Sequence, residues 1–227
     1  MMKTKENYTA LVTEAGNGLG KTFANILLEH NYKVILAACG ESYKLLSEED
    51  GHARGYELIE VDFTSDSTLI QMYNTVRSSW GQLDLLINNA EIVNGFGQKI
   101  DQIDLDEVKK LYEINLFAVI RIIQLMKPLL EESQRPTIIN VTSALGDINK
   151  MKEEAFCYAN YCLTAYASSK AALNMFTQLQ FKEFKHSKIK IRSFDPVVRE
   201  NCTYNSVFIC NSVKDEFISL IQEGKEL

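Results

Sequence analysis

Long apolar runs and a basic surplus are both missing from this chain of 227 residues. Its apolar stretches have the length of core strands, and Arg121 and Lys127 interrupt the apolar pattern that follows Leu116, so we expect no membrane span. The net charge of -6 argues against nucleic acid or an anionic membrane as the main partner, because both attract basic surfaces. The N-terminal residues 1–9 are polar and lack an apolar signal region, which disfavours export.

Paired cysteines and clustered histidines are also absent. The five cysteines are an odd number and form no Cys-x-x-Cys motif, which favours reduced thiols in the cytoplasm. The three histidines lie far apart without the spacing of metal ligands, so we expect no metal site.

What the chain does contain is a regular alternation of short apolar runs with helical periods, without a linker or an internal repeat. This alternation is typical of a parallel sheet that helices cover on both faces. Right-handed crossovers then predict a single α/β domain over 1–227, a doubly wound, Rossmann-like parallel sheet with strand order 3-2-1-4-5-6. The predicted strands are 8–12, 33–38, 58–61, 83–88, 137–141 and 189–194, and the predicted helices are 19–28, 42–49, 67–79, 105–130 and 164–182. A further helix at 213–221 is left open, and no convincing strand follows it.

A glycine-containing turn follows the first predicted strand and opens a helix. It runs from Thr13 to Gly20 and contains Gly16, Gly18 and Gly20. Glycines at such a turn let the backbone approach a pyrophosphate, and the N-terminus of the helix attracts its charge. A tight turn without a ligand remains the alternative for this segment taken alone.

From residue 8 to about residue 201 the sequence resembles the short-chain dehydrogenase/reductase family, in its compact single-domain subgroup. Its motifs occur in the family's order, each at a predicted strand end or helix. The turn resembles Thr-Gly-x-x-x-Gly-x-Gly, and later segments resemble Asn-Asn-Ala-Gly, a serine-bearing fifth strand and Tyr-x-x-x-Lys. The matching residues are Thr13, Gly18 and Gly20, then Asp62, Asn88, Asn89 and Ala90, and finally Asn115, Ser143, Tyr166 and Lys170.

The resemblance implies NAD or NADP as cofactor and a small carbonyl or alcohol as substrate. Tyr166 would exchange a proton with the substrate oxygen, and Ser143 would hydrogen-bond that oxygen. Lys170 would stabilise the phenolate and hold the nicotinamide ribose, and Asn115 would position a water. Local structural roles remain the alternative for Ser143 and Asn115. The implied cofactor contacts are Thr13, Gly18, Leu19, Gly20, Asp62, Asn89, Ala90, Lys170 and Pro196.

Four departures from the family pattern lie around the implied cofactor. Glu14 replaces the first glycine of the turn, and Glu91 replaces the glycine of Asn-Asn-Ala-Gly. We expect Glu14 beside the pyrophosphate and Glu91 near the adenosine, where both carboxylates weaken binding unless they turn to solvent. Val197 replaces a glycine, and the second strand ends on Ala38 and Cys39 instead of an acidic or arginine residue. Asn17 also lacks the basic side chain that often accompanies NADP, so the sequence does not choose between NAD and NADP.

Two further segments differ in length from the family. The stretch between Ser143 and Tyr166 is longer than usual, and its extra residues, 147–161, form either a lid or one wall of the substrate pocket, or else a solvated surface excursion. The C-terminal region is short. A homodimer through the helices that bear Asn115 and Tyr166 is therefore expected, with a tetramer as the alternative.

Two functions remain open at this stage. The four residues Asn115, Ser143, Tyr166 and Lys170 favour an NAD(P)-dependent oxidoreductase. The two glutamates at 14 and 91 favour a catalytically weak or inactive family member that serves as a binding or regulatory protein.

Overall fold

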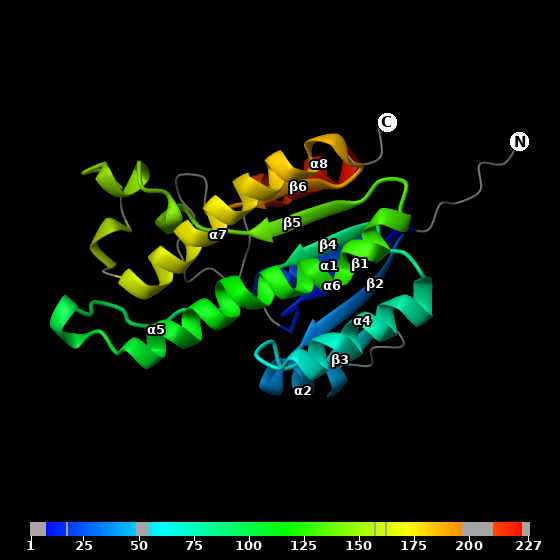
Figure 1. Ribbon diagram of the computed structural model, residues 1–227, viewed down its shortest axis with the longest axis horizontal. Helices are drawn as coiled ribbons and strands as arrows, with labels where there is room; N and C mark the ends of the chain where they lie inside the picture. Colours follow the sequence, from blue (N-terminus) through cyan, green and yellow to red (C-terminus); the bar gives the residue numbers. More distant parts are fainter. Residues whose placement is uncertain are drawn as a thin grey trace, which may run out of the picture.

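A computed structural model describes residues 8–16, 18–48, 55–156, 158–161, 163–196 and 211–223. Six parallel strands form one sheet in the order β3-β2-β1-β4-β5-β6, which confirms the predicted doubly wound topology (Figure 1). The carboxyl ends of all six strands therefore lie at one edge, where ligands of open α/β sheets bind. The strands are β1 Tyr8–Thr13, β2 Tyr32–Ala38, β3 Tyr56–Glu60, β4 Leu85–Asn88, β5 Thr137–Val141 and β6 Lys190–Phe194.

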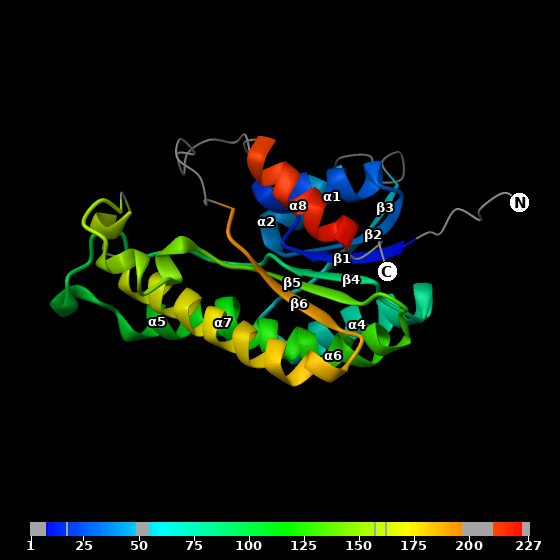
Figure 2. The ribbon, with the colours of Figure 1, turned by 90° about the horizontal axis from the view of Figure 1, so that it is seen from above.

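Helices cover both faces of the sheet, as Figure 2 shows. α1, α2 and α8 lie over one face, and α4, α5, α6 and α7 lie over the other. None of the helices in the described ranges is long and apolar enough to cross a membrane. The helices are α1 Gly18–Glu29, α2 Gly40–Glu48, α4 Asp66–Trp80, α5 Leu105–Tyr112, α6 Val119–Glu132, α7 Thr164–Glu183 and α8 Asn211–Glu223.

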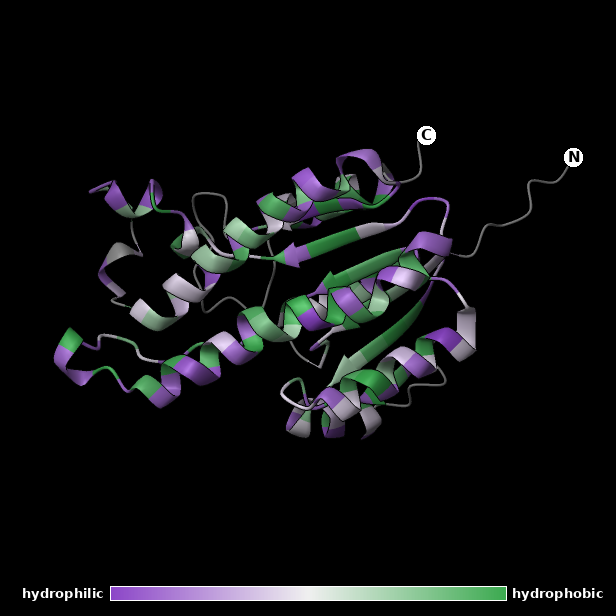
Figure 3. Cartoon of the chain, viewed as in Figure 1, coloured by the Kyte–Doolittle hydropathy of each residue, from purple (hydrophilic) through white to green (hydrophobic). Residues whose placement is uncertain are grey.

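The central strands are buried on both faces, which explains the short apolar run that each of them contains. In β1 the side chain of Leu11 packs into the cluster on the α4–α6–α7 side, whereas Ala10 and Val12 pack into the cluster on the α1–α8 side. All three are fully buried. The central strands are accordingly coloured mostly green, the colour of hydrophobic residues, in Figure 3.

The helix that the sequence left open at 213–221 is present as α8. Val213, Phe217 and Ile221 are spaced four residues apart, so they share one helix face, and all three are buried against the sheet. The centre of the Phe217 ring lies 4.3 Å from the centre of the Phe23 ring on α1. Within the described residues no strand follows β6, and the residues after α8 lie outside them.

The single long helix predicted over 105–130 is divided. A π-helical segment, η2 Glu113–Ala118, separates α5 from α6. The extra residue per turn in such a segment reorients one side chain, and here the buried Asn115 lies within it. The prediction of one regular helix was wrong here, because the spacing of apolar residues does not show where a helix takes one extra residue in a turn.

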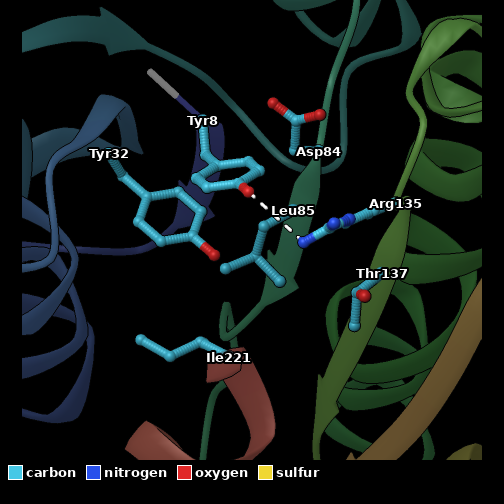
Figure 4. Close-up of a pocket in the computed structure, with 7 residues that line it drawn as sticks. All are labelled: Tyr8, Tyr32, Asp84, Leu85, Arg135, Thr137 and Ile221. Carbon is cyan, nitrogen blue, oxygen red and sulfur yellow. Dashed lines mark hydrogen bonds between the residues drawn. The ribbon is translucent and has the colours of Figure 1, made fainter. Parts of the chain in front are cut away.

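The amino edge of the sheet, opposite to the ligand edge, is tied together by Asp84. Its carboxylate accepts hydrogen bonds from the Thr9 backbone N–H at 2.8 Å and the Ser133 hydroxyl at 2.6 Å. Beside it is a cavity of about 10 Å³, room for about one water (Figure 4). Burial, then the charge of Asp84, raises the pKa of Tyr32 in the wall of this cavity. The arrangement stabilises the start of β4, which begins at Leu85 instead of the predicted residue 83.

Candidate active site

The glycine turn lies at the carboxyl end of β1 and opens α1. A Cβ atom on Gly20 would lie 2.5 Å from the Glu14 carbonyl oxygen and 2.7 Å from the Asn89 side-chain nitrogen, so only glycine fits there. Gly18 has a φ of +53°, which glycine tolerates best. Leu19 packs against the core on the α1 side of the sheet. Two residues singled out in the sequence, Asn17 and Val197, lie outside the described residues.

Thr13, Asn89 and Ala90, three of the predicted cofactor contacts, connect the turn to the end of β4. The Thr13 hydroxyl accepts hydrogen bonds from the backbone N–H groups of Asn89 and Ala90, each at 2.9 Å. The Asn89 amide donates to the carbonyl oxygens of Thr13 at 3.0 Å and Glu14 at 2.9 Å. These residues therefore fix the shape of the ligand edge between two neighbouring strands.

Glu14 adopts a left-handed backbone conformation, with φ at 53°. Its carboxylate turns to the end of β2, where the Cys39 thiol donates to Oε2 at 3.3 Å. Burial, followed by the charge and hydrogen bond of Glu14, raises the pKa of the Cys39 thiol to about 11, so the thiol stays neutral. The sequence predicts a Glu14 carboxylate beside the pyrophosphate, and it does not predict the contact with the Cys39 thiol.

Replacing Glu14 with glycine is expected to raise the free energy of unfolding by about 0.5–1 kcal/mol. The left-handed conformation strains a residue with a Cβ by about 1–2 kcal/mol, whereas glycine adopts it without strain. Glycine loses more conformational entropy on folding, which offsets part of this gain. Urea denaturation of the purified variant measures the effect. Glu14→Ala is the matched control, because it removes the carboxylate but keeps the strain. A midpoint that rises equally in both variants would show that the strain is not the cause.

Asp62 follows β3 and is solvent-exposed. Its carboxylate accepts hydrogen bonds from the Thr64 hydroxyl at 2.7 Å and the Thr64 backbone N–H at 2.9 Å. These two hydrogen bonds lower the pKa of Asp62, so it is ionised at neutral pH. The predicted adenine contact is thus a fixed negative group at the same edge as the glycine turn.

Tyr166 and Lys170 lie one turn apart on α7, as their spacing predicts, and both side chains are only 1 % exposed. The Lys170 ammonium lies 5.7 Å from the centre of the Tyr166 ring. It donates to the Val141 carbonyl oxygen, at the carboxyl end of β5, at 3.0 Å. Thus α7 and β5 together bring a buried phenol and a buried ammonium to the ligand edge.

Glu91 joins these two groups. Its Oε2 atom lies 2.6 Å from the Lys170 ammonium and accepts a hydrogen bond from the Tyr166 hydroxyl at 3.1 Å. The prediction that placed Glu91 near the adenosine was therefore wrong. Glu91 follows β4, and β4 lies beside β5, against whose end the Lys170 side chain packs. The sequence therefore places Glu91 near Lys170, but it does not give the direction of the Glu91 side chain. The Glu91 side chain is 32 % exposed and connects the buried pair to solvent.

Asn115 is fully buried and its amide is engaged by protein groups. It accepts from the Ile92 backbone N–H at 2.9 Å, and donates to the Ile92 carbonyl at 3.0 Å and the Ser169 hydroxyl at 3.1 Å. Asn115 therefore holds the segment that carries Glu91 against α7. The predicted water contact of Asn115 stays a prediction.

Ser143 follows β5 and is buried. Its hydroxyl accepts a hydrogen bond from the Leu145 backbone N–H at 3.2 Å, a local contact of the kind kept open above. A Cβ on Gly146 would lie 2.6 Å from the Lys170 backbone, so this glycine lets the loop after Ser143 pack directly on α7. The structure thus brings Ser143 to the same strand edge as the pair.

A cavity of about 570 Å³ opens beside Ser143. The extra residues 147–161 supply part of its wall, and Lys150 forms an ion pair with Asp195, after β6, at 3.7 Å. Pro196, which follows Asp195 in the sequence, is half-buried. Tyr166 and Lys170 are not among the residues that line this cavity.

The aromatic side chains of the extra segment pack on the other side, around Tyr166. Phe156 and Tyr158 lie edge to face with ring centres 5.6 Å apart, and both contact the buried cluster that includes Tyr166. The backbone N–H of Gly97 donates to the Tyr161 carbonyl oxygen at 3.0 Å. Phe156 and Tyr158 therefore pack this end of the segment onto the site, whereas residues 151–155 are exposed to solvent.

A model of the short chain dehydrogenase family matches residues 8–202, which include the turn, Glu91 and the buried pair. The chain belongs to the short chain dehydrogenase family. This is a family of oxidoreductases, and the match confirms the resemblance drawn from the sequence motifs.

The chain is similar to two curated oxidoreductases. An uncharacterized oxidoreductase of Saccharomyces cerevisiae is 29 % identical over 181 residues, 78 % of this chain and 66 % of that protein. The diacetyl reductase, (S)-acetoin forming, of Staphylococcus epidermidis is 26 % identical over 194 residues, 84 % of this chain and 70 % of that protein. The chain thus spans about two thirds of the length of these relatives.

A solved structure supports the fold. The NADPH-bound carbonyl reductase from chicken fatty liver superposes with a TM-score of 0.74 and 24 % identity, covering 84 % of this chain and 79 % of that one. At this level of identity the likeness establishes the Rossmann-like architecture.

Proposed function

We propose that this protein is an NAD(P)-dependent oxidoreductase that interconverts a small carbonyl compound and its alcohol. The observation that carries the proposal is the buried Tyr166–Lys170 pair at the strand edge that also bears the glycine turn. A phenol and an ammonium held together in this way suit proton exchange with a substrate oxygen. Two of the similar proteins are named as a diacetyl reductase and a carbonyl reductase, and the reduction of a carbonyl group requires this proton exchange.

The residues present fit a dinucleotide at this edge. The close packing at Gly20 leaves the first turn of α1 pressed against the end of β1, and such a helix N-terminus binds a pyrophosphate. We assign the pyrophosphate to the turn at Gly18, Leu19 and Gly20, the adenosine to Asp62 and the loop at Asn89 and Ala90, and the nicotinamide ribose to Lys170.

When bound, a nicotinamide cofactor would supply the hydride in reduction and accept it in oxidation. The Tyr166 hydroxyl gives its proton to the substrate oxygen in reduction and takes it back in oxidation. Ser143 accepts from the Leu145 backbone N–H, so it can donate its hydroxyl hydrogen to the same oxygen, which stabilises the charge that develops there. Lys170 favours the ionised phenol, and Asn115 keeps the β4 loop in place.

A catalytically weak binding protein is the second candidate, and Glu91 favours it. Its carboxylate already occupies both the Lys170 ammonium and the Tyr166 hydroxyl. If a ribose hydroxyl takes the place of this carboxylate at Lys170, the loss of the ion pair costs binding free energy.

Titration with NADH and NADPH, followed by nicotinamide fluorescence, tests the proposal. Saturable binding together with reduction of a small diketone such as diacetyl supports the oxidoreductase. Absence of binding to either cofactor contradicts it and favours the weak binding protein.

We further propose that one domain carries both the cofactor site and the catalytic residues, in a cytoplasmic setting. Cys39 is free, in keeping with the reduced thiols expected from the sequence. The substrate is a small molecule, and neither nucleic acid nor a membrane is proposed as a partner, because the net charge is -6.

We expect a homodimer in solution, formed through α7 and the neighbouring η2 segment. Three apolar side chains of these elements are at least half exposed: Met175 (63 %), Leu179 (54 %) and Phe117 (50 %). An exposed apolar patch on a soluble protein often marks a surface where another protein binds. Sedimentation equilibrium measures the mass. Met175→Glu with Leu179→Glu is expected to give monomers, whereas the control Ile70→Glu on α4 leaves the dimer intact. A monomeric wild type would contradict the expectation.

A further inference from the structure

The carboxyl end of β2 has no charged residue of its own but receives a carboxylate from a neighbouring strand. In dinucleotide-binding folds an acidic residue at this end binds the adenosine ribose diol, or an arginine binds a 2′-phosphate. Here Ala38 and Cys39 stand there, and Glu14 Oε2 lies 3.3 Å from the Cys39 sulfur. The Glu14 backbone is held on both sides, by the Ala37 carbonyl oxygen at 2.6 Å and by the Asn89 amide at 2.9 Å. Its carboxylate is therefore anchored at this position.

Asp62, at the end of the adjacent strand β3, adds a second negative charge at the same place. The charges of Glu14 and Asp62 both act on the Cys39 thiol, in that order of size, after burial. Thr64 keeps Asp62 ionised. Among the ion pairs formed within the described part of the chain, none neutralises Glu14 or Asp62.

We infer that Glu14 makes the cofactor site selective for a nucleotide without a 2′-phosphate, that is for NAD over NADP. The inference rests on the proposed function, since it assigns the adenosine half of the proposed cofactor site. A ribose diol donates hydrogen bonds to the carboxylate in place of the Cys39 thiol. A 2′-phosphate brings its own negative charge against Glu14 and Asp62.

The size of the effect follows from Coulomb repulsion. A doubly charged phosphate at about 4 Å from one carboxylate weakens binding by at least about tenfold even in water-like surroundings. Part of this penalty disappears at high salt, because the Debye length falls to about 3 Å at 1 M.

The test compares adenosine 5′-monophosphate with adenosine 2′,5′-bisphosphate, which differ only in the 2′-phosphate. Neither fragment carries a nicotinamide ribose, so the contact between Glu91 and Lys170 does not enter the comparison. Binding is followed by chemical-shift titration of the full chain. We expect the wild type to bind the bisphosphate at least about tenfold more weakly, and Glu14→Gln to reduce this ratio to about threefold or less.

Glu29→Gln is the matched control, because it removes the same charge at the far end of α1, about 18 Å along the helix. It is expected to leave the ratio unchanged. Equal or tighter binding of the bisphosphate by the wild type overturns the inference and leaves the proposed cofactor site standing. An unchanged ratio in Glu14→Gln also overturns it. If neither fragment binds, the inference and the cofactor part of the proposed function fall together.

Discussion

Replacing Tyr166 with phenylalanine is expected to lower kcat for carbonyl reduction by about 10²- to 10⁴-fold, the usual contribution of a positioned proton donor. Phenylalanine keeps the ring in the buried cluster with Leu163 and Leu145, so the fold remains intact. It also leaves the Lys170 ammonium in place. The dissociation constant for NADH or NADPH is therefore expected to stay nearly unchanged. Steady-state kinetics and fluorescence titration measure the two quantities separately.

Two variants define what this result means. Tyr158→Phe, in the neighbouring aromatic group, is the matched control and is expected to retain wild-type turnover. Lys170→Ala is expected to impair both turnover and cofactor affinity, because Lys170 serves the phenol and the ribose. Wild-type turnover in Tyr166→Phe would remove Tyr166 from the mechanism, whichever substrate is used.

The sheet and its strand order were predictable because a buried parallel strand leaves a plain record in the sequence. Every side chain of β5, for example, is buried, and its apolar residues face both ways: Ile138 packs on one side of the sheet, and Ile139 and Val141 pack on the other. Strand ends were less predictable. The start of β4 depends on the hydrogen bonds of Asp84 with Thr9 and Ser133, which lie 75 and 49 residues away. A contact over that distance has no local sequence signal.

The site was predictable where helical spacing decides it. Tyr166 and Lys170 are four residues apart, so a helix puts them on one face. The conformations of Glu14 and Glu91 were not predictable, because each side chain reaches from its own strand end to a different element, Glu14 to the end of β2 and Glu91 to α7. A sequence shows that both glutamates replace glycine, but only the fold shows that one reaches Cys39 and the other reaches Lys170.

The contact of Glu91 with Lys170 has a physical origin in burial. The Lys170 side chain is 1 % exposed, and an ammonium removed from water needs an acceptor or an opposite charge nearby. The Val141 carbonyl supplies one acceptor and Glu91 supplies the charge. In the proposed complex the ribose hydroxyls take over part of this role. Glu91 and the cofactor therefore compete for the same ammonium.

Replacing Glu91 with glycine is accordingly expected to tighten NADH or NADPH binding by at least about tenfold, which corresponds to about 1.4 kcal/mol. The same change is expected to lower the stability of the free protein, because the buried ammonium loses its charged partner. Isothermal titration measures the affinity, and urea denaturation measures the free energy of unfolding. Competition between Glu91 and the cofactor for Lys170 requires that the variant binds the cofactor more tightly and that its free energy of unfolding is lower.

Glu91→Gln separates charge from bulk, since glutamine keeps the size of the side chain and its hydrogen-bonding oxygen but not its charge. If charge dominates, Glu91→Gln tightens binding nearly as much as Glu91→Gly does; if bulk dominates, only the change to glycine does. Equal dissociation constants for all three proteins would show that Glu91 leaves Lys170 without cost when the cofactor binds, and an ordinary dehydrogenase would remain. If the wild type binds neither cofactor and Glu91→Gly binds one of them, the catalytically weak binding protein is the correct function, and Glu91 is the residue that prevents cofactor binding.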